Sequence, residues 1–366
     1  MPRTLVQTKH FHLTKQLRNR LQFIPVGAAL PTIAEFMEEY GVSQATVNRA
    51  LSQLRKEGLI DRPAGRKRFY VDAIQPTALH RVALIRPSWP SPDYDGIVRA
   101  VVAAGTPRQF AFHIQSYADL QTLNLNHSIR DQEAALFIAT PEAFPERLRE
   151  ALRRPHKPVI FLRGKPANLN ASAVGVDNLE IGRLATRHLT ELGHRRILAL
   201  LSEPASDSSS ARLAGWREIM QQTGIADAEE LAVNCTVRAG EDALANCYQK
   251  FLRWLDAPHP DFTAIFCVAW TGALAATRAL HERGLTVPGD VSLITFDSEA
   301  RLSPFFVPPL TTVEVDVGEY AKQAIDLVEE SLMNAPSPPR QMILKPRLVV
   351  RGTTAPRIVT GKGNAQ

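Results

Sequence analysis

Apolar residues recur at helical spacing in the first fifth of the chain. Leu13, Leu17 and Leu21 lie four residues apart, which predicts a helix over residues 9–22. A later stretch places four apolar residues at i, i+3, i+4 and i+7, so that they form one buried stripe: Val47, Ala50, Leu51 and Leu54. This second helix therefore turns one face to a core and leaves the opposite face free.

The segment before that stripe carries signals for the start and end of a helix. Thr32-Ile-Ala-Glu35 is a capping box, in which the Thr hydroxyl and the Glu carboxylate each satisfy a backbone N–H at a helix start. A short helix therefore begins at Thr32 and runs to about Tyr40. Gly41 suits a left-handed turn after it, and Ser43 can cap the next helix. The spacing predicts a helix-turn-helix.

The helix after Ser43 exposes small and hydrogen-bonding side chains. The stripe opposite the buried one, with its flanks, consists of Ala45, Thr46, Asn48, Arg49, Ser52, Gln53 and Lys56. Such a surface suits a helix that enters a DNA major groove, where Asn, Gln and Arg read base edges. The alternative is that any surface helix is polar on its outer face.

Two short apolar segments follow, residues 59–61 and 69–71, and they predict a two-stranded wing. The loop between them carries four cations: Arg62, Arg66, Lys67 and Arg68. A basic loop beside a helix-turn-helix can hold phosphates or enter the minor groove. We therefore expect DNA contacts from both the helices and the wing, at Thr32, Ser43, Gln44, Ala45, Thr46, Asn48, Arg49, Arg66, Lys67 and Arg68.

Beyond residue 81 the pattern changes to short apolar runs without polar alternation, at residues 82–85, 134–138, 158–162, 197–201, 263–268 and 291–296. Such runs are typical of parallel strands that are covered on both faces. Amphipathic helices lie between them. In one of these, Ile181, Ala185 and Leu189 share a face and Gly193 ends the helix. Strand-helix alternation over about 270 residues predicts an α/β fold with two doubly wound parallel-sheet lobes.

Charge is uneven along the chain. Residues 1–76 hold 12 Lys and Arg against 6 Asp and Glu, whereas the remaining residues hold 31 of each. The whole formal excess of +6 therefore lies in the N-terminal fifth, which is the electrostatic footprint of DNA binding. No stretch is apolar and long enough for a membrane span or a signal peptide, so we expect a cytoplasmic protein without membrane contact.

Enzymatic, metal and cofactor chemistry has little support in the sequence. Cys235, Cys247 and Cys267 are widely spaced and fit neither a disulfide framework nor a zinc site, so we expect small core or surface residues. The ten His residues show no metal spacing, and the motifs of P-loops, nucleophile elbows and zinc proteases are missing. We predict that the protein is not an enzyme and has no metal or cofactor.

Residues 11–71 resemble the winged-helix domain of the gluconate-repressor (GntR) family. The capping box, the recognition-type helix, Glu57-Gly-Leu-Ile60 and the basic hairpin carry the resemblance. The chain departs from the family at Ala34, where the family has Arg, and at Ser43-Gln-Ala-Thr-Val-Asn48, where the family reads S-R-x-T-V-R. Phosphate or guanine contacts are missing at these positions. Because Asn and Gln pair well with adenine, we expect an adenine-containing half-site.

Residues 81–352 resemble the effector domains of the lactose and galactose repressor (LacI/GalR) family. The motifs that match occur in the family's order: Val174-Gly-Val-Asp-Asn178, Gly182, His188-Leu-Thr-Glu-Leu-Gly-His-Arg-Arg-Ile197, Arg212-Leu-Ala-Gly-Trp216, Val287-Pro-Gly-Asp-Val-Ser292, Phe296-Asp297, Pro309-Leu-Thr-Thr312 and Pro346-Arg-Leu-Val-Val-Arg351. A GntR-type reader joined to a LacI-type sensor is the arrangement of arabinose-repressor-like regulators. The resemblance implies a periplasmic-binding-protein-like fold whose two lobes close on a small molecule.

Ligands of parallel sheets bind beyond the C-terminal ends of the strands. The residues at the predicted strand ends are Arg86, Ser88, Trp89, Thr140, Arg163, Ser202, Ala269, Trp270 and Asp297. The resemblance implies that Asp297 holds sugar hydroxyls and that Arg212 contacts the ligand from the other lobe.

Each of these candidates has a structural alternative. Asp297 can be a helix or turn cap, Arg212 can form a surface salt bridge, and the tryptophans can be ordinary core residues. Asp95 either reaches the pocket or caps a helix. Ala269 and Trp270 stand where family members carry a polar residue and a small acid, so the pocket is expected to be smaller, more apolar or tuned to an unusual ligand.

These patterns divide the chain into a winged-helix domain over residues 1–72, a linker over 73–80, an effector-binding and dimerisation domain over 81–352 and a disordered tail over 353–366. The leading hypothesis is a repressor of carbohydrate-utilisation genes. Its homodimer would bind a palindromic double-stranded DNA operator and respond to a sugar or sugar derivative. The alternatives are a cytosolic sugar-binding protein, and a regulator whose sensor binds a non-sugar ligand or only dimerises.

Overall fold

The computed structural model describes residues 9–21, 24, 27–63, 66, 68–71, 79–88, 91–140, 144–153, 155–164, 169–225, 228–298, 301–333 and 338–357. The chain divides into two compact units, Met1–Leu79 and His80–Gln366. Each unit has a hydrophobic core of its own. No helix in the described ranges is both long and apolar enough to cross a bilayer.

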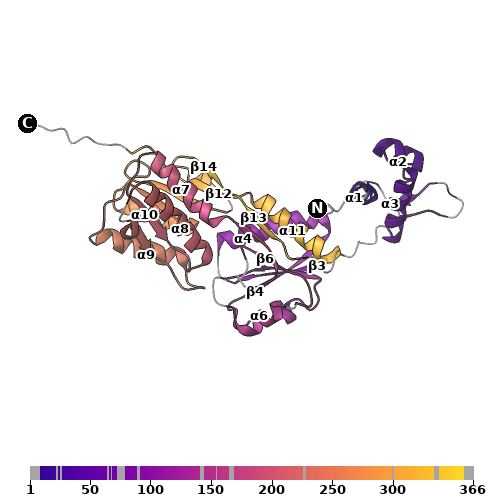
Figure 1. Cartoon of the computed structure of the whole chain (residues 1–366), viewed down its shortest axis with the longest axis horizontal. Coiled ribbons are helices and arrows are strands. Elements are labelled where there is room, and N and C mark those ends of the chain that lie inside the picture. The colour runs from indigo at the N-terminus through magenta and orange to yellow at the C-terminus, as the bar shows by residue number, and fades with distance from the viewer. Residues whose placement is uncertain are drawn as a thin grey trace, which may run out of the picture. The chain divides into compact units, whose positions relative to one another are not determined.

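The first unit contains helices α1 (Lys9–Leu21), α2 (Ile33–Tyr40) and α3 (Gln44–Lys56), followed by the antiparallel strands β1 (Ile60–Asp61) and β2 (Tyr70–Val71) (Figure 1). The stripe predicted on α3 is buried, as are the three leucines of α1: Leu13, Leu17, Leu21, Val47, Ala50, Leu51 and Leu54 are at most 4% exposed. The apolar spacing therefore predicted the core of this unit correctly.

The predicted caps are also present. Thr32 accepts the backbone N–H of Glu35, while the Glu35 carboxylate accepts the Thr32 N–H at 2.6 Å, which completes the capping box. Gly41 ends α2 in the left-handed conformation with φ 61°. Ser43 then caps α3 by accepting the Thr46 N–H at 3.4 Å. This tight turn between the two helices defines the helix-turn-helix.

The second unit consists of two lobes, each built on its own six-stranded sheet. In the first lobe all strands are parallel, in the order β13 (Gln341–Leu344), β7 (Ser172–Val176), β6 (Val159–Leu162), β5 (Ala134–Ile138), β3 (His80–Pro87) and β4 (Phe110–Tyr117). The helices of this lobe are α4 (Pro92–Gly105), α5 (Leu125–Ser128), α6 (Glu146–Arg153) and α11 (Val317–Met333). Successive residues of β3 alternate between two cores, one under α4 and α11 and the other under α5 and α6.

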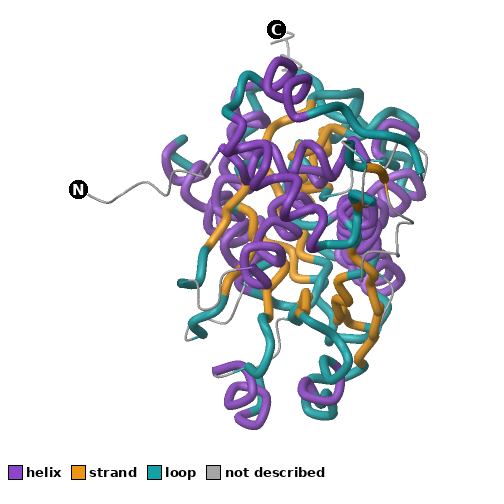
Figure 2. The backbone as a smooth tube through the Cα atoms, turned by 90° about the vertical axis from the view of Figure 1, so that its right-hand side faces the viewer, coloured by secondary structure: helices purple, strands orange, loops and turns teal. Residues whose placement is uncertain are grey.

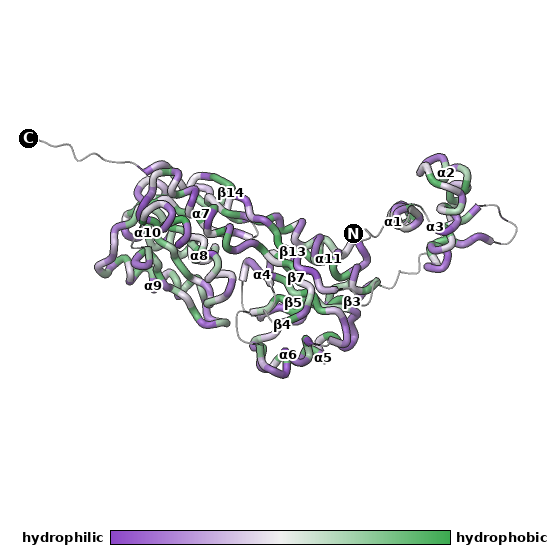
Figure 3. The backbone as a smooth tube through the Cα atoms, in the orientation of Figure 1, coloured by the Kyte–Doolittle hydropathy of each residue, from purple (hydrophilic) through white to green (hydrophobic). Residues whose placement is uncertain are grey.

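The second lobe has the strand order β14 (Arg347–Val349), β12 (Thr311–Glu314), β11 (Ser292–Asp297), β10 (Ala264–Cys267), β8 (Ile197–Leu201) and β9 (Ala232–Asn234). Only β14 is antiparallel to its neighbour among these described strands. The helices are α7 (Asn178–Glu191), α8 (Asp207–Gln222), α9 (Ala243–Asp256) and α10 (Trp270–Glu282), with α7 packed on α8 and α9 on α10. Figure 2 distinguishes the helices from the strands along the backbone, and Figure 3 shows hydrophobic residues following the strands.

The chain crosses between the lobes three times in the described ranges. The crossings lie between β7 and α7, between β12 and α11, and between β13 and β14. Consequently α11, although it follows the second sheet in sequence, packs on the first lobe, where Tyr320 and Ile325 join the core. A two-lobed unit joined by short crossings is a mixed α/β fold of the predicted class.

Several strands escaped prediction. The six apolar runs correspond to β3, β5, β6, β8, β10 and β11, but β4, β7, β9, β12, β13 and β14 were not expected. β4 lies at the edge of its sheet with an alternating and partly exposed sequence, and β13 and β14 are short edge strands. Edge strands lack the continuous apolar run by which central parallel strands are recognised.

The C-terminal segment differs from the expected disordered tail. Thr353 is 3% exposed, donates its hydroxyl to the Leu293 carbonyl at 2.7 Å, and accepts the Leu293 N–H through its own carbonyl at 2.7 Å. The hydroxyl of Ser292 donates to the carbonyl of Ala355 at 3.2 Å. Residues 353–357 therefore belong to the second lobe, because backbone pairing rather than apolar spacing holds them. Residues 358–366, like residues 73–78 of the expected linker, lie outside the described ranges, and His80 already belongs to β3.

Candidate functional site

The first unit presents the N-terminal half of α3 to solvent. Gln44, Ala45, Asn48 and Arg49 are exposed on this helix. The hydroxyls of Ser43 and Thr46 lie 3.0 Å apart, so these two predicted contact residues also form the cap. The exposed amide and guanidinium groups have the chemistry that reads base edges in a major groove.

The wing is braced by its own arginines. The Arg66 guanidinium lies 4.9 Å from the centre of the Tyr70 ring, and that of Arg62 lies 5.8 Å from the Phe69 ring. Arg68 forms a 3.5 Å ion pair with Glu35, the capping residue of α2. That pair ties the wing to the helix-turn-helix and partly neutralises Arg68. Lys67, the remaining predicted wing contact, lies outside the described residues.

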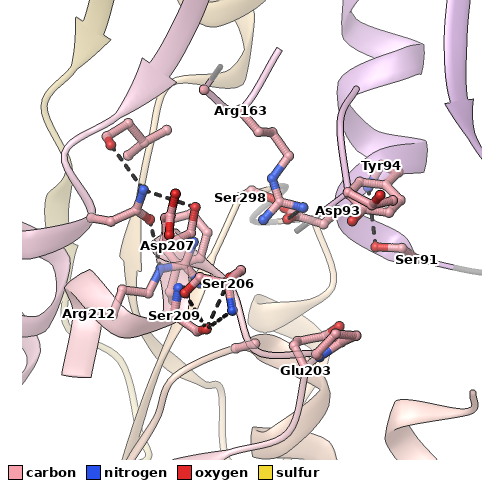
Figure 4. Close-up of a pocket in the computed structure, with 18 of the residues that line it drawn as sticks. Ser91, Asp93, Tyr94, Arg163, Glu203, Ser206, Asp207, Ser209, Arg212 and Ser298 are labelled. Atoms are coloured by element: carbon pink, nitrogen blue, oxygen red, sulfur yellow. Dashed lines mark hydrogen bonds and ion pairs between the residues drawn. The ribbon is translucent and has the colours of Figure 1, made fainter. Parts of the chain in front are cut away.

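The second unit contains a cavity of about 570 Å³ between its two lobes. Four helices begin at its wall: α4 near Asp93, α7 at Asn178, α8 at residues 206–209 and α10 at residues 270–271. Further parts of the wall come from the carboxyl ends of β5, β6, β7, β8, β10 and β11 and from Ile343 of β13. Figure 4 shows Arg163, Glu203 and Arg212 among the residues that line the cavity. Helix N-termini present backbone N–H groups and a positive dipole end, so polar groups of a ligand find donors here.

Arg212 is the most buried cation of the cavity wall. Its side chain is held by Nε donating to Asn178 Oδ1 at 2.9 Å, by Nη1 donating to the Val268 carbonyl at 2.9 Å, and by the Phe296 ring, whose centre lies 4.0 Å away. No carboxylate in the described ranges pairs with it. Burial, with the nearby charge of Arg163, lowers the pKa of Arg212 to about 9, so the group is still protonated at neutral pH. An incompletely neutralised guanidinium is a strong partner for ligand oxygens.

Arg163 supplies the cation of the opposite lobe. It ends β6 in a left-handed conformation with φ 70°, which is uncommon for a residue with a side chain. Its Nη1 lies 2.6 Å from Asp93 Oδ2, its guanidinium lies 5.1 Å from the centre of the Tyr94 ring, and its backbone N–H donates to the Tyr320 hydroxyl at 2.6 Å. Although burial opposes it, the Asp93 carboxylate raises the pKa of Arg163.

Thr140, just beyond β5, has a hydroxyl with an unmet hydrogen-bonding capacity. The residue is 5% exposed and lines the cavity, and its Oγ1 has no partner among the described residues. A buried hydroxyl without a partner is costly, and such groups in native structures call for an explanation. A ligand atom in the cavity would supply the missing bond.

Asp297 lies at the end of β11 and is 5% exposed. Its Oδ2 accepts the hydroxyl of Ser303, which fixes the carboxylate at the cavity wall. Asp297 and Arg212 belong to the same lobe, so the expectation that they lie on opposite lobes is wrong, while the contact of Arg212 with a ligand stays a prediction. On the first lobe, Arg163 is a partly buried arginine of the wall, whereas Arg149 and Arg153 of α6 line the cavity with exposed side chains.

Trp270 opens α10 and lines the cavity. Its ring meets that of Phe306 edge-on at a centroid distance of 5.7 Å. Ala269, the residue at the N-cap, forms no side-chain cap. Without a side-chain cap, the first backbone N–H groups of this helix can donate to a ligand, apart from that of Gly272, which donates to the Ala269 carbonyl at 3.0 Å.

Two predicted ligand residues lie elsewhere. Arg86 donates Nη1 to Asp95 Oδ1, and neither residue lines the cavity. Asp95 is not the helix cap either, because Ser91 caps α4. Trp89, the third candidate of this segment, lies outside the described residues.

Sequence reasoning missed Asp93, Asn178 and above all Glu203. Glu203 directly follows the strand-end residue Ser202, and its Oε1 accepts the Thr271 hydroxyl at 2.6 Å. Burial raises the pKa of Glu203. The Ser-rich residues 206–209 form the capped start of α8 at the cavity wall. A carboxylate two residues beyond the predicted strand over residues 197–201 was the available signal.

A basic winged helix joined to a two-lobed α/β unit with a polar cavity defines a DNA-binding regulator with a ligand-sensing domain. The comparisons with known proteins agree. Residues 12–71 match the model of bacterial regulatory proteins of the gntR family, and residues 186–354 match that of a periplasmic binding protein-like domain.

Similar proteins are regulators of transcription. The chain is 27% identical over 345 residues to the HTH-type transcriptional regulator MalR of Streptomyces coelicolor, covering 88% of this chain and 96% of that protein. A LacI family regulator from Enterococcus faecium, solved with bound ribose, superposes with a TM-score of 0.65 at 22% identity over 76% of this chain and all of that one. The regulator CelR in complex with cellobiose gives 0.63 at 24% identity, over 85% and 91%. Residues 12–71 are thus similar to the DNA-binding domains of gntR-family regulators and residues 186–354 to periplasmic binding protein-like domains, in a chain whose similar proteins are regulators of transcription.

Proposed function

We propose that the protein represses carbohydrate-utilisation genes and that its affinity for DNA changes when a small hydroxylated effector binds between the lobes. The unmet bonding capacity on the two walls of the cavity carries this proposal. Thr140 offers an unpartnered hydroxyl from the first lobe, and Arg212 offers an incompletely neutralised guanidinium from the second. Ribose and cellobiose in the two similar structures support a sugar as the class of effector.

The wall of the cavity suits a polyol. A carboxylate accepts hydroxyl protons, whereas a guanidinium and helix N–H groups donate to hydroxyl oxygens. Asp297 and Arg212 provide the first two, and α8 and α10 provide the third. A ligand that bonds to both Thr140 and Arg212 stabilises the closed arrangement of the lobes.

The proposed change in DNA affinity requires two coupled copies of the DNA-binding domain. We propose a homodimer in the cytoplasm that places two α3 helices on a palindromic operator, since helix-turn-helix proteins bind half-sites about one helical turn apart. Phe305 and Val307 are 82% and 92% exposed on the second lobe and are suited to burial against a second copy. Replacing both by Asp is expected to give a monomer in sedimentation and weaker DNA binding. A dimer with unchanged DNA affinity would contradict this assignment.

A thermal-unfolding screen of the full chain tests the proposed effector class. Sugars, sugar acids, sugar phosphates, nucleosides and purines are compared, because a ligand at about 100 times its dissociation constant stabilises the native state by about 2.7 kcal/mol. Thr140→Val removes only the unpartnered hydroxyl, so we expect unchanged or higher stability without ligand and a smaller shift with it.

Thr106→Val is the matched control, because Thr106 lies outside the cavity and donates to the Val102 carbonyl at 2.7 Å. An equal loss of the shift in both variants would contradict a ligand contact at Thr140. The absence of a shift with any compound would contradict the sensor role.

A further inference from the structure

Glu203 is a carboxyl group at the cavity wall that the protein itself does not neutralise. Its partner in the described residues is the hydroxyl of Thr271, and no Lys, Arg or His of these ranges forms an ion pair with it. Asp93, by contrast, is paired with Arg163 at 2.6 Å. A carboxylate with one neutral donor retains most of the cost of leaving water.

The less exposed charged groups of the cavity wall also include more carboxyl groups than guanidinium groups. Three of the charged side chains that line the cavity are exposed to solvent: Arg149, Arg153 and Asp207. The others are the carboxyl groups of Asp93, Glu203 and Asp297 and the guanidinium groups of Arg163 and Arg212. Among these less exposed groups the carboxyl groups exceed the guanidinium groups by one, and the pKa of Glu203 is raised although Arg163 and Arg212 oppose the rise. Burial is the main cause of that rise, and the Asp93 charge adds to it.

A neutral hydroxyl group would give Glu203 a hydrogen bond but would leave the excess charge in place. A protonated amine gives the hydrogen bond and the opposite charge together, which is the stronger interaction for a carboxylate that is largely withdrawn from water. Charge complementarity therefore favours a cation at this point of the wall.

We propose that the effector is a hydroxylated molecule with one basic nitrogen, an amino sugar or amino polyol, whose ammonium group binds Glu203. This inference rests on the proposed sensor function and specifies its ligand class. The hydroxyl groups of the same ligand bind Arg212 and Thr140. Binding of the ammonium group requires the ionised carboxylate, so a proton leaves Glu203 when the ligand enters at a pH below the pKa of that group.

Matched probes that differ at one position test the proposal. D-glucosamine, D-galactosamine and D-mannosamine are titrated into the full chain by calorimetry, beside the parent hexoses and the N-acetyl derivatives, which keep the nitrogen but lose its charge. We expect at least one amine to bind more tightly than both of its neutral counterparts. Glu203→Gln keeps the shape of the side chain and removes its charge. It is expected to lower the affinity for that amine by about 30-fold or more. Glu150→Gln, at an exposed position of α6 outside the cavity, is the control.

The dependence of affinity on pH gives a second readout. Asp93, Arg163 and Arg212 are the charged groups that act on Glu203. The affinity of an amine should increase as the pH rises through the pKa of Glu203, whereas the affinity of a ligand that needs the protonated carboxyl should fall.

Three outcomes overturn the proposal: no binding by any amine, equal or tighter binding of the neutral counterpart, and an amine affinity unaffected by Glu203→Gln. If neutral sugars bind while amines have no advantage, the sensor function stands and only this inference fails. If no compound of the wider screen binds, both fail.

Discussion

Gly182 of α7 lies directly against the backbone carbonyl of Arg212 on α8, so closely that a Cβ on Gly182 would overlap that oxygen. Likewise, a Cβ on Gly215 of α8 would overlap the backbone carbonyl oxygen of Leu179 on α7. The two helices therefore touch through their backbones at this level. This close contact sets the depth at which the Arg212 side chain enters the cavity.

Gly182→Ala is expected to move α8 away from α7. Overpacking of this kind costs about 1–3 kcal/mol of unfolding free energy, and the displaced guanidinium should also weaken ligand binding. Chemical denaturation and ligand titration measure the two effects. Gly318→Ala, in the first turn of α11, is the control, because its Cβ would meet only the Asp316 carboxylate, at 3.2 Å. Normal stability and ligand binding in Gly182→Ala would show that the contact does not position Arg212.

Arg49→Ala should weaken DNA binding without changing the ligand response. The residue is exposed on α3. If Arg49 reads a base, its loss costs about 1–3 kcal/mol of discrimination between base pairs. If it contacts a phosphate, its loss lowers the slope of affinity against salt concentration by about 1. Binding is measured on a duplex selected from a random-sequence pool, at several salt concentrations. Arg278→Ala removes the same charge from an exposed position of α10. Equal losses in the two variants would mean that Arg49 contributes only general charge.

Two truncated chains should differ sharply in melting temperature. Ending the chain after Arg357 keeps the bonds of Thr353 and Ala355, whereas ending it after Gly352 removes the 2.7 Å bonds between Thr353 and Leu293. The three hydrogen bonds of Thr353 to Leu293 and Thr311, at about 1 kcal/mol each, together with the bonds of Thr354, Ala355 and Arg357, predict a marked fall in the melting temperature for the shorter chain alone. Equal melting temperatures would contradict the assignment of this segment to the second lobe.

Glu203→Gln should stabilise the protein when no ligand is present. The pKa of Glu203 is raised above its ordinary value of 4.5 by burial, so the native state binds the proton more tightly than the unfolded state does. The stability that this proton contributes is complete below pH 4.5 and is lost as the pH rises through the pKa of the native state. The variant should therefore unfold at a higher temperature than the native protein at pH 7, and the difference should shrink toward pH 4. A variant that is less stable at pH 7 would contradict the unfavourable burial of this charge.

Short-range sequence signals were enough to predict the DNA-binding domain. The capping box at Thr32, the turn at Gly41 and the stripe that includes Val47 and Leu51 are determined by residues within one or two helical turns of each other. The central strands of the two sheets were also predictable, because a run such as residues 134–138 is buried on both faces. These features depend little on the rest of the chain.

The cavity wall was predicted only in part. Thr140, Arg163, Trp270 and Asp297 lie at strand ends or directly after them, so the strand pattern placed them on the wall. Glu203 and Asp93 depend on tertiary arrangement, since their role follows from which charges face them across the cavity. The prediction that Arg212 and Asp297 lie on opposite lobes was wrong because the crossings of the chain between the lobes are short and carry no sequence pattern.

The affinity of the full chain for its selected DNA duplex, measured with and without the effector found in the thermal screen, tests the central claim most directly. A coupling of about 1–3 kcal/mol predicts a 5- to 150-fold change in affinity. Asp297→Ala should abolish that change while leaving the affinity without effector intact, because Asp297 lies at the cavity wall of the second unit. An effector that binds the sensor at saturation and leaves the DNA affinity unchanged would contradict a ligand-responsive regulator.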